Sequence, residues 1–183
     1  MSAYVPETFH FGDREVTVDM NEFYDMIFEA PYDFCAWLLE HEAWRDLDQV
    51  CQGFHIDHVE MLGQWAAQEM AKLPKESRNL VDGTVKDLPT LLRFLAGACP
   101  WMVANDRLNQ ANFEHAEAAP TIASEEKVCA AAKSLIDAAL GYPPPYRDCM
   151  VQRSLAWADF VDRRWLQGLN IPPPWGRPKK PLR

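Results

Sequence analysis

The chain has 183 residues and a net charge of -9, and 48% of its residues are hydrophobic and 11% aromatic. This length and composition suffice to bury a core without disulfide bonds, which argues against disorder over most of the chain and favours one domain, or one domain with an appendage. The charge is uneven, since residues 1–80 carry 16 acidic and 5 basic residues and residues 146–183 carry 3 and 8. The acidic majority argues against nonspecific binding to nucleic acid or an anionic membrane.

The first residues predict a β-hairpin. Residues 8–11 and 14–18 place Phe9 and Phe11, and then Val16 and Val18, on single faces, and a Gly-Asp turn lies between the two strands. Such a hairpin must pack on other elements, because two strands alone are only marginally stable.

The rest of the chain shows apolar residues at helical spacing between cap residues, glycines and prolines. The predicted helices run approximately between these pairs of residues: Asn21 and Pro31, Asp33 and Trp44 with a possible extension over 46–52, Val59 and Leu73, Asp87 and Leu95, Pro100 and Glu117, Ser124 and Gly141, and Asp148 and Leu166. Asn21, Asp33, Asp87 and Ser124 are the expected N-terminal caps.

These elements predict a mainly α fold of about six or seven short helices. We expect a compact orthogonal bundle with a small N-terminal β-hairpin and an extended Pro-rich C-terminal tail. The predicted parts are an acidic helical domain with the hairpin (1–141), a C-terminal helix that packs on it (142–169) and a Pro-rich basic tail (170–183).

The five cysteines are an odd number at irregular spacing and mostly lie among apolar residues. We therefore expect reduced core thiols in a cytoplasmic, reducing compartment. The N-terminus carries no pattern of a secretory signal peptide, and no apolar stretch is long enough to span a bilayer.

Cys51, His55 and His58 recur at steps of four and three, which could bring thiolate and imidazole ligands of zinc to one helix face. Gly53 interrupts this run and no fourth ligand lies nearby, so a helix start or core packing accounts for the three residues better. We expect no cofactor and no metal. The five serines lie in no nucleophile motif and the eight glycines form no phosphate-binding loop, so a noncatalytic protein is favoured.

The last helix and the tail suggest a role in binding another protein. Prolines pre-form an extended backbone, and Trp and Arg are the residues that interfaces favour. The candidate partner-binding residues are Trp157, Phe160, Arg163, Arg164, Trp165, Trp175, Arg177, Lys179 and Lys180. We expect the partner to be a protein or protein complex, and we expect neither direct nucleic-acid binding nor membrane insertion. The chain would then act as an adaptor, an inhibitor or an accessory subunit of a larger assembly.

Two alternatives stay open. Acidic residues recur every two to six positions from Glu7 to Asp33, as they would in an inhibitor that imitates nucleic acid and also in an ordinary solvated surface. An enzyme or metal protein could assemble its site from distant His, Glu and Cys residues, which spacing along the sequence does not reveal.

The tail could dock on a partner or fold back on the acidic body.

Overall fold

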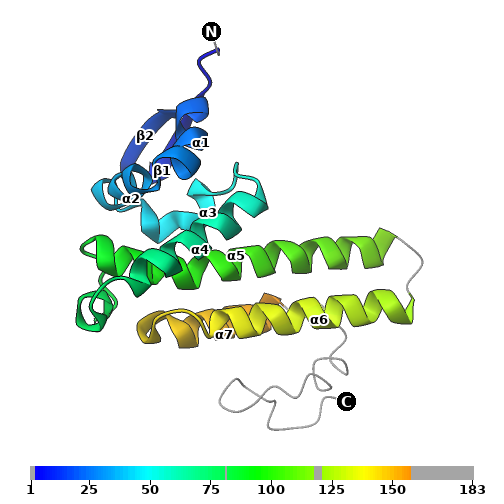
Figure 1. Ribbon diagram of the computed structural model, residues 1–183. Coiled ribbons are helices and arrows are strands. Elements are labelled where there is room, and N and C mark those ends of the chain that lie inside the picture. The colour runs from blue at the N-terminus through cyan, green and yellow to red at the C-terminus, as the bar shows by residue number, and fades with distance from the viewer. Residues whose placement is uncertain (1–2, 81, 118–120, 158–183) are drawn as a thin grey trace.

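The structure is a computed structural model that describes residues 3–80, 82–117 and 121–157. In these ranges, seven α-helices come after an N-terminal two-stranded antiparallel sheet, so the predicted mainly α fold with a hairpin is confirmed (Figure 1). The elements are β1 (Pro6–Phe11), β2 (Arg14–Asp19), α1 (Met20–Glu29), α2 (Pro31–Glu40), η1 (Ala43–Asp46), α3 (Leu47–Val50), α4 (Ile56–Ala71), η2 (Lys75–Arg78), α5 (Leu88–Glu117), α6 (Ile122–Ala139) and α7 (Pro144–Trp157). Within these ranges no helix is both long and apolar enough to cross a membrane.

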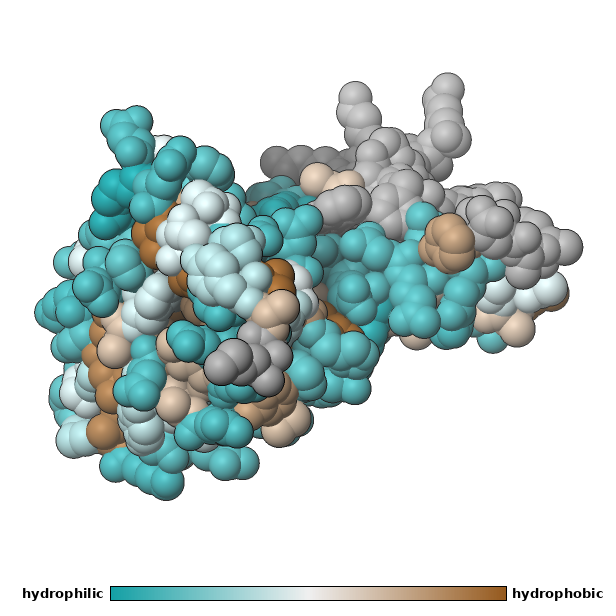
Figure 2. Space-filling view, turned by 90° about the horizontal axis from the view of Figure 1, so that it is seen from above, coloured by the Kyte–Doolittle hydropathy of each residue, from teal (hydrophilic) through white to brown (hydrophobic). Residues whose placement is uncertain are grey.

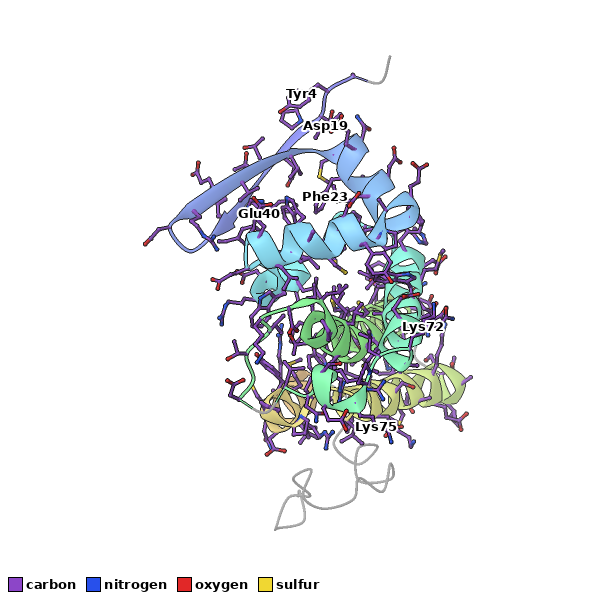
Figure 3. The ribbon with its side chains drawn as sticks, turned by 60° about the vertical axis from the view of Figure 1, so that its left-hand side comes forward. Tyr4, Asp19, Phe23, Glu40, Lys72 and Lys75 are labelled. Atoms are coloured by element: carbon purple, nitrogen blue, oxygen red, sulfur yellow. The ribbon has the colours of Figure 1, made fainter. Side chains whose placement is uncertain are left out.

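The hairpin is stabilised by aromatic packing on the helices next to it in the chain. Phe9 and Phe11 are both buried on one face of β1, where Phe9 pairs with Val16 of β2. Phe23 of α1 lies beneath the hairpin, with its ring centroid 5.6 Å from Phe9 and 4.8 Å from Trp37 of α2 (Figure 3). These rings supply the contact area that a two-stranded sheet lacks by itself.

The long helix α5 connects the two halves of the molecule. It has 30 residues, and it packs against α4 on one side and runs beside α6 on the other (Figure 1). Its inward-facing leucines, Leu91, Leu95 and Leu108, have no solvent exposure. The helix α7 packs on α6. The hairpin lies with α1 and α2 at one end of the molecule, and α5 and α6 extend away from that end (Figure 1).

The prediction that Pro100 opens a new helix is wrong, because α5 continues through Pro100. Proline lacks the N–H that would bond the carbonyl of Ala96, which usually ends or kinks a helix. Here the neighbouring side chains of Ala98, Cys99 and Trp101 are at most 2% exposed. Packing on both sides of α5 therefore outweighs the missing hydrogen bond. As a result α5 is a single helix of 30 residues, whereas the sequence predicted only short helices.

Two of the predicted N-terminal caps are displaced to a nearby residue. Asp19, and not Asn21, caps α1, because its carboxylate accepts a hydrogen bond from the Asn21 N–H at 3.0 Å. Thr121, and not Ser124, caps α6, and Ser124 is the third helical residue of a reciprocal capping box. In each case two neighbouring residues could cap, and the earlier residue does so.

The prolines also account for differences at α2 and α7. Pro31 is the first residue of α2 and not merely the stop of α1, and Ala30 takes the cap position assigned to Asp33. The helix α7 begins at Pro144 and not at Asp148. Proline suits the first turn of a helix, where its missing N–H has no intrahelical partner to lose. The helix α2 ends at Glu40, before Glu42 adopts a left-handed backbone with φ of 49°.

Candidate functional site

Most of the partner-binding residues predicted from the sequence lie outside the part of the chain that the structure describes. These residues are Phe160, Arg163, Arg164, Trp165, Trp175, Arg177, Lys179 and Lys180. Trp157 is the last residue of α7 in the described range. The structure does place the helix that leads to them, because the buried Ser154 of α7 accepts a hydrogen bond at 2.8 Å from Nε1 of Trp101 in α5.

An exposed cluster of large side chains lies where α1 and α2 meet α4. We call it the aromatic patch, and it consists of Phe28, Tyr32, His58, Met61 and Trp65. Phe28, Tyr32 and Met61 are 42%, 49% and 53% exposed, whereas His58 and Trp65 are half-buried. Figure 2 shows several hydrophobic areas among hydrophilic ones on the wider part of the molecule. Exposed apolar clusters of this kind commonly mark interaction sites.

Helical spacing and ring contacts hold the patch together. His58, Met61 and Trp65 share one face of α4 because they occur at steps of three and four residues. The ring of Phe28 meets that of His58 edge-to-face with centroids 4.1 Å apart, and Tyr32 meets Trp65 in the same way at 5.0 Å. The side chains from three helices therefore form one surface.

A hydrogen bond fixes one edge of the patch. The hydroxyl of Tyr32 donates to the carboxylate of Glu69, which also accepts from Nζ of Lys72 at 2.8 Å. Lys72 lies at the C-terminal end of α4 (Figure 3). The bond to Lys72, and after it the bond to Tyr32, lowers the pKa of Glu69. The same bond to Glu69 raises the pKa of Tyr32. The Tyr32 ring is thus oriented before any ligand arrives.

His58 carries an unusual polar atom within the patch. Its ring nitrogen Nδ1 is buried and has no hydrogen-bond partner among the residues that the structure describes. Buried polar atoms in folded proteins are normally hydrogen-bonded, since an unmade bond costs about 1–3 kcal/mol. This atom therefore distinguishes the patch from an ordinary group of surface side chains.

Acidic residues lie close in sequence to the members of the aromatic patch on α1 and α2. Asp25 and Glu29 on α1 and Asp33 on α2 are exposed, and within the described ranges none of the three forms an ion pair. On α4, Glu60 pairs with Arg107 at 3.2 Å. The patch is consequently an apolar surface with uncompensated negative charge along its α1 and α2 side.

The acidic series noted in the sequence lies on the hairpin, α1 and α2. Seven of its members are exposed: Glu7, Asp13, Glu15, Glu22, Asp25, Glu29 and Asp33. The eighth, Asp19, is half-buried and caps α1. The series is therefore spread over the surface of several elements and does not lie along a single helix face.

Of the possible zinc ligands, Cys51 follows α3, whereas His55 and His58 lie at the start of α4 with their ring centroids 5.6 Å apart. Cys51 comes directly after α3, is 4% exposed and has its pKa raised well above the usual value, chiefly by burial. His55 is the N-terminal cap of α4, and its Nδ1 accepts from the Asp57 N–H at 3.3 Å. His58 packs on Phe28. Across the described ranges, no three or more His, Cys, Asp or Glu side chains are placed to hold a metal ion.

A pocket of about 270 Å³ lies between η1, α5 and α7 and is lined by aromatic rings that include Trp44 and Tyr146. Its cations already have partners within the chain. The guanidinium of Arg153 is 3.3 Å from Asp48 and lies over the ring of Trp101 at 4.9 Å, and that of Arg45 lies over Trp44 at 4.5 Å. The charged side chains of this pocket therefore already have partners within the chain, unlike the buried nitrogen of His58 in the aromatic patch.

Sequence reasoning did not identify the aromatic patch, because its members come from three helices between residues 28 and 65. The available signal was a second stripe on α4, formed by His58, Met61 and Trp65, beside the buried stripe of Val59, Leu62 and Ala66. No protein-family model, curated protein or solved structure matches this chain. A function must therefore be inferred from the geometry of the described residues.

Proposed function

We propose that this protein is a noncatalytic protein-binding module, acting as an adaptor, an inhibitor or an accessory subunit of a larger assembly. The aromatic patch is its contact surface. The observation that supports this proposal is the exposure of Phe28, Tyr32 and Met61 in one cluster with an unpartnered buried nitrogen of His58. Aromatic residues and Met are enriched in the cores of protein interfaces.

The energetics of the patch favour binding. Fully burying one such apolar side chain contributes about 1.5–3 kcal/mol, and about half of that remains to be gained at each of Phe28, Tyr32 and Met61, which are about half exposed. Ordering a side chain at an interface costs about 0.5–1.5 kcal/mol, and that cost is reduced where the side chain is already held in place. Phe28 and Tyr32 are held by their ring contacts with His58 and Trp65 before a partner arrives.

The proposal includes the aromatic and basic residues that the sequence indicates after α7. Trp157 is the last residue of α7, Phe160, Arg163, Arg164 and Trp165 follow it in the sequence, and Trp and Arg are frequent anchors at interfaces. A reducing, cytoplasmic setting belongs to the same proposal, because the chain has an odd number of cysteines, of which Cys35, Cys51, Cys99 and Cys129 are buried.

The test is affinity capture with the intact chain, with titration of each captured protein after its purification. Met61→Asp places a charge in the patch at a side chain that is 53% exposed, so the fold should tolerate it. We expect this change to weaken partner binding tenfold or more while the melting temperature stays within a few degrees of the wild-type value.

Phe113→Asp is the matched control, because Phe113 is 65% exposed on α5 and is not part of the patch. This variant should bind the partner with wild-type affinity. Equal affinities of the wild type and the Met61→Asp variant for every captured protein would refute the assignment of the aromatic patch.

A further inference from the structure

Residues 170–183 have the composition that complements the aromatic patch. They contain five prolines, the indole of Trp175 and the basic side chains of Arg177, Lys179, Lys180 and Arg183, and no acidic residue. They lie outside the part of the chain that the structure describes. Proline-rich segments are recognised by surfaces lined with aromatic rings, because their extended backbone has little entropy left to lose.

The aromatic patch offers such a surface within the same polypeptide. Phe28, Tyr32 and Trp65 provide three rings that contact one another or His58, and Met61 lies exposed between the positions of His58 and Trp65 on α4. Met side chains adapt their shape to an aromatic partner and pack well against rings. The indole of Trp175 and the neighbouring prolines match this lining.

The charges of the segment also complement those beside the aromatic patch, independently of the aromatic contacts. Asp25, Glu29 and Asp33 flank the patch without an ion pair in the described ranges. The segment brings cations at three positions spaced one or two residues apart, Arg177, Lys179 and Lys180. Pairing an arginine or lysine with a carboxylate forms charge-assisted hydrogen bonds, which are stronger than neutral ones.

The chain is long enough to make this contact. About 14 residues separate the end of α7 from the first proline of the segment, and an extended chain of that length spans about 50 Å. The longest helix, α5, has 30 residues and is therefore about 45 Å long, so a connection of about 50 Å is long enough for the segment to reach the α1 and α4 side.

From these matches we infer that residues 170–183 cover the aromatic patch of their own chain in the unbound protein. Trp175 packs against the rings, and the basic residues pair with the acidic residues of α1 and α2. The inference rests on the proposed function, because a partner that binds the patch must displace this segment. The partner's apparent affinity is then reduced by the fraction of molecules in which the patch is covered.

Photo-crosslinking in the full chain tests the contact directly. Met61 is replaced by p-benzoylphenylalanine, the protein is irradiated without any partner, and the crosslinked peptides are identified by mass spectrometry. We expect crosslinks to peptides from residues 170–183. The matched control carries the same photoreactive residue at Phe113, which is 65% exposed elsewhere on the surface, and should give at least tenfold fewer crosslinks to this segment.

Two further measurements make the result decisive. Trp175→Ala combined with Lys179→Glu and Lys180→Glu should lower the yield from position 61 at least tenfold. A mixture of ordinary and heavy-isotope protein distinguishes contacts within one chain from contacts between copies. Crosslinks between copies, an unchanged yield in the triple variant, or equal yields from positions 61 and 113 would each overturn the inference.

The outcome is separable from that of the proposed function. If position 61 gives no crosslinks to the segment and Met61→Asp still weakens binding of a purified partner, the patch is the binding surface and the covering segment is rejected. If the crosslinks form but Met61→Asp leaves every partner's affinity unchanged, the segment covers the patch and the partner-binding function is rejected.

Discussion

Trp101 and Ser154 form a buried polar pair that joins α5 to α7. Both side chains are at most 1% exposed, and the Ser154 hydroxyl accepts from the indole at 2.8 Å and donates to the carbonyl of Met150 at 2.7 Å. Ser154→Ala leaves the indole N–H buried without an acceptor. We expect the free energy of unfolding to fall by about 1–3 kcal/mol, as measured by urea denaturation.

Ser134→Ala serves as the control for this prediction. The hydroxyl of Ser134 also bonds a carbonyl one turn earlier in its helix, that of Ala130 at 3.1 Å, but this residue is exposed. Its loss should change stability by no more than about 0.5 kcal/mol. If the two variants were equally stable, the bond between α5 and α7 would contribute nothing to the fold.

The cysteines differ in exposure and should differ in reactivity. Burial raises the pKa of Cys35 and of Cys99 to about 12, whereas Cys149 is exposed. Because a thiol with a pKa of about 12 is ionised in about one molecule in ten thousand at pH 8, the buried thiols hold almost no reactive thiolate there. Iodoacetamide at pH 8 should therefore label Cys149 first in the native protein.

Mass spectrometry of the labelled peptides checks this order. Adding urea should expose the other four cysteines together, since their protection comes from the folded core. Labelling of Cys99 as fast as Cys149 in the native state would contradict the burial of α5 against its neighbours.

At the scale of elements, two glycines set how closely α5 approaches the end of α6. A Cβ atom added at Gly97 would lie 2.7 Å from the carbonyl oxygen of Gly141 and 2.9 Å from Cα of Tyr142. These are backbone atoms, which cannot rotate away as a side chain can. We expect Gly97→Ala to lower the free energy of unfolding by about 1–3 kcal/mol, although alanine favours a helix.

Gly53→Ala provides a comparison at another close contact. There the added Cβ would meet the hydroxyl oxygen of Tyr24 at 3.0 Å, and a terminal side-chain atom can shift by a few tenths of an ångström. Urea denaturation should therefore show a much smaller loss for this variant. A Gly97→Ala protein as stable as wild type would mean that α5 and α6 can separate at no cost.

The sequence predicted most of the elements from local patterns, although helix ends such as the caps of α1 and α6 lie at a neighbouring residue. Alternation over Phe9 and Phe11 with a Gly-Asp turn indicated the hairpin, and the apolar stripe from Val59 indicated α4. It failed at Pro100, because the local rule that proline ends a helix is overridden by packing against α4 and α6. That packing involves residues far away in the sequence.

The aromatic patch was unpredictable for a related reason. Phe28 and Tyr32 form one surface with His58 and Trp65 only when the fold brings α1 and α2 against α4. Their exposure is a property of the assembled fold, and an exposed aromatic residue has the same sequence pattern as a buried one. The predicted contact residues from Phe160 to Lys180 remain predictions.

At the scale of the whole molecule, salt separates the protein-binding proposal from the acidic inhibitor that imitates nucleic acid. Apolar contacts are not screened, whereas exposed charges are screened beyond about 10 Å at 0.1 M salt. If Phe28, Tyr32 and Met61 carry the interaction, partner affinity should fall by no more than about tenfold between 0.05 and 0.5 M salt. Titration of the purified partner at several salt concentrations measures this dependence.

A loss of several orders of magnitude over that range would instead favour the acidic inhibitor. The hairpin, α1 and α2 carry the exposed acidic residues that such an inhibitor would use, from Glu7 to Asp33. Its partner would then be a basic protein that normally binds nucleic acid.

The position of α5 determines how the molecule should come apart on heating. Residues of this helix, among them Leu91, Leu95 and Leu108, are buried between α4 on one side and α6 on the other. Neither half can unfold without exposing the buried apolar side chains on one side of α5. The protein should therefore unfold as a single cooperative unit, with one calorimetric peak whose measured enthalpy equals the van't Hoff enthalpy.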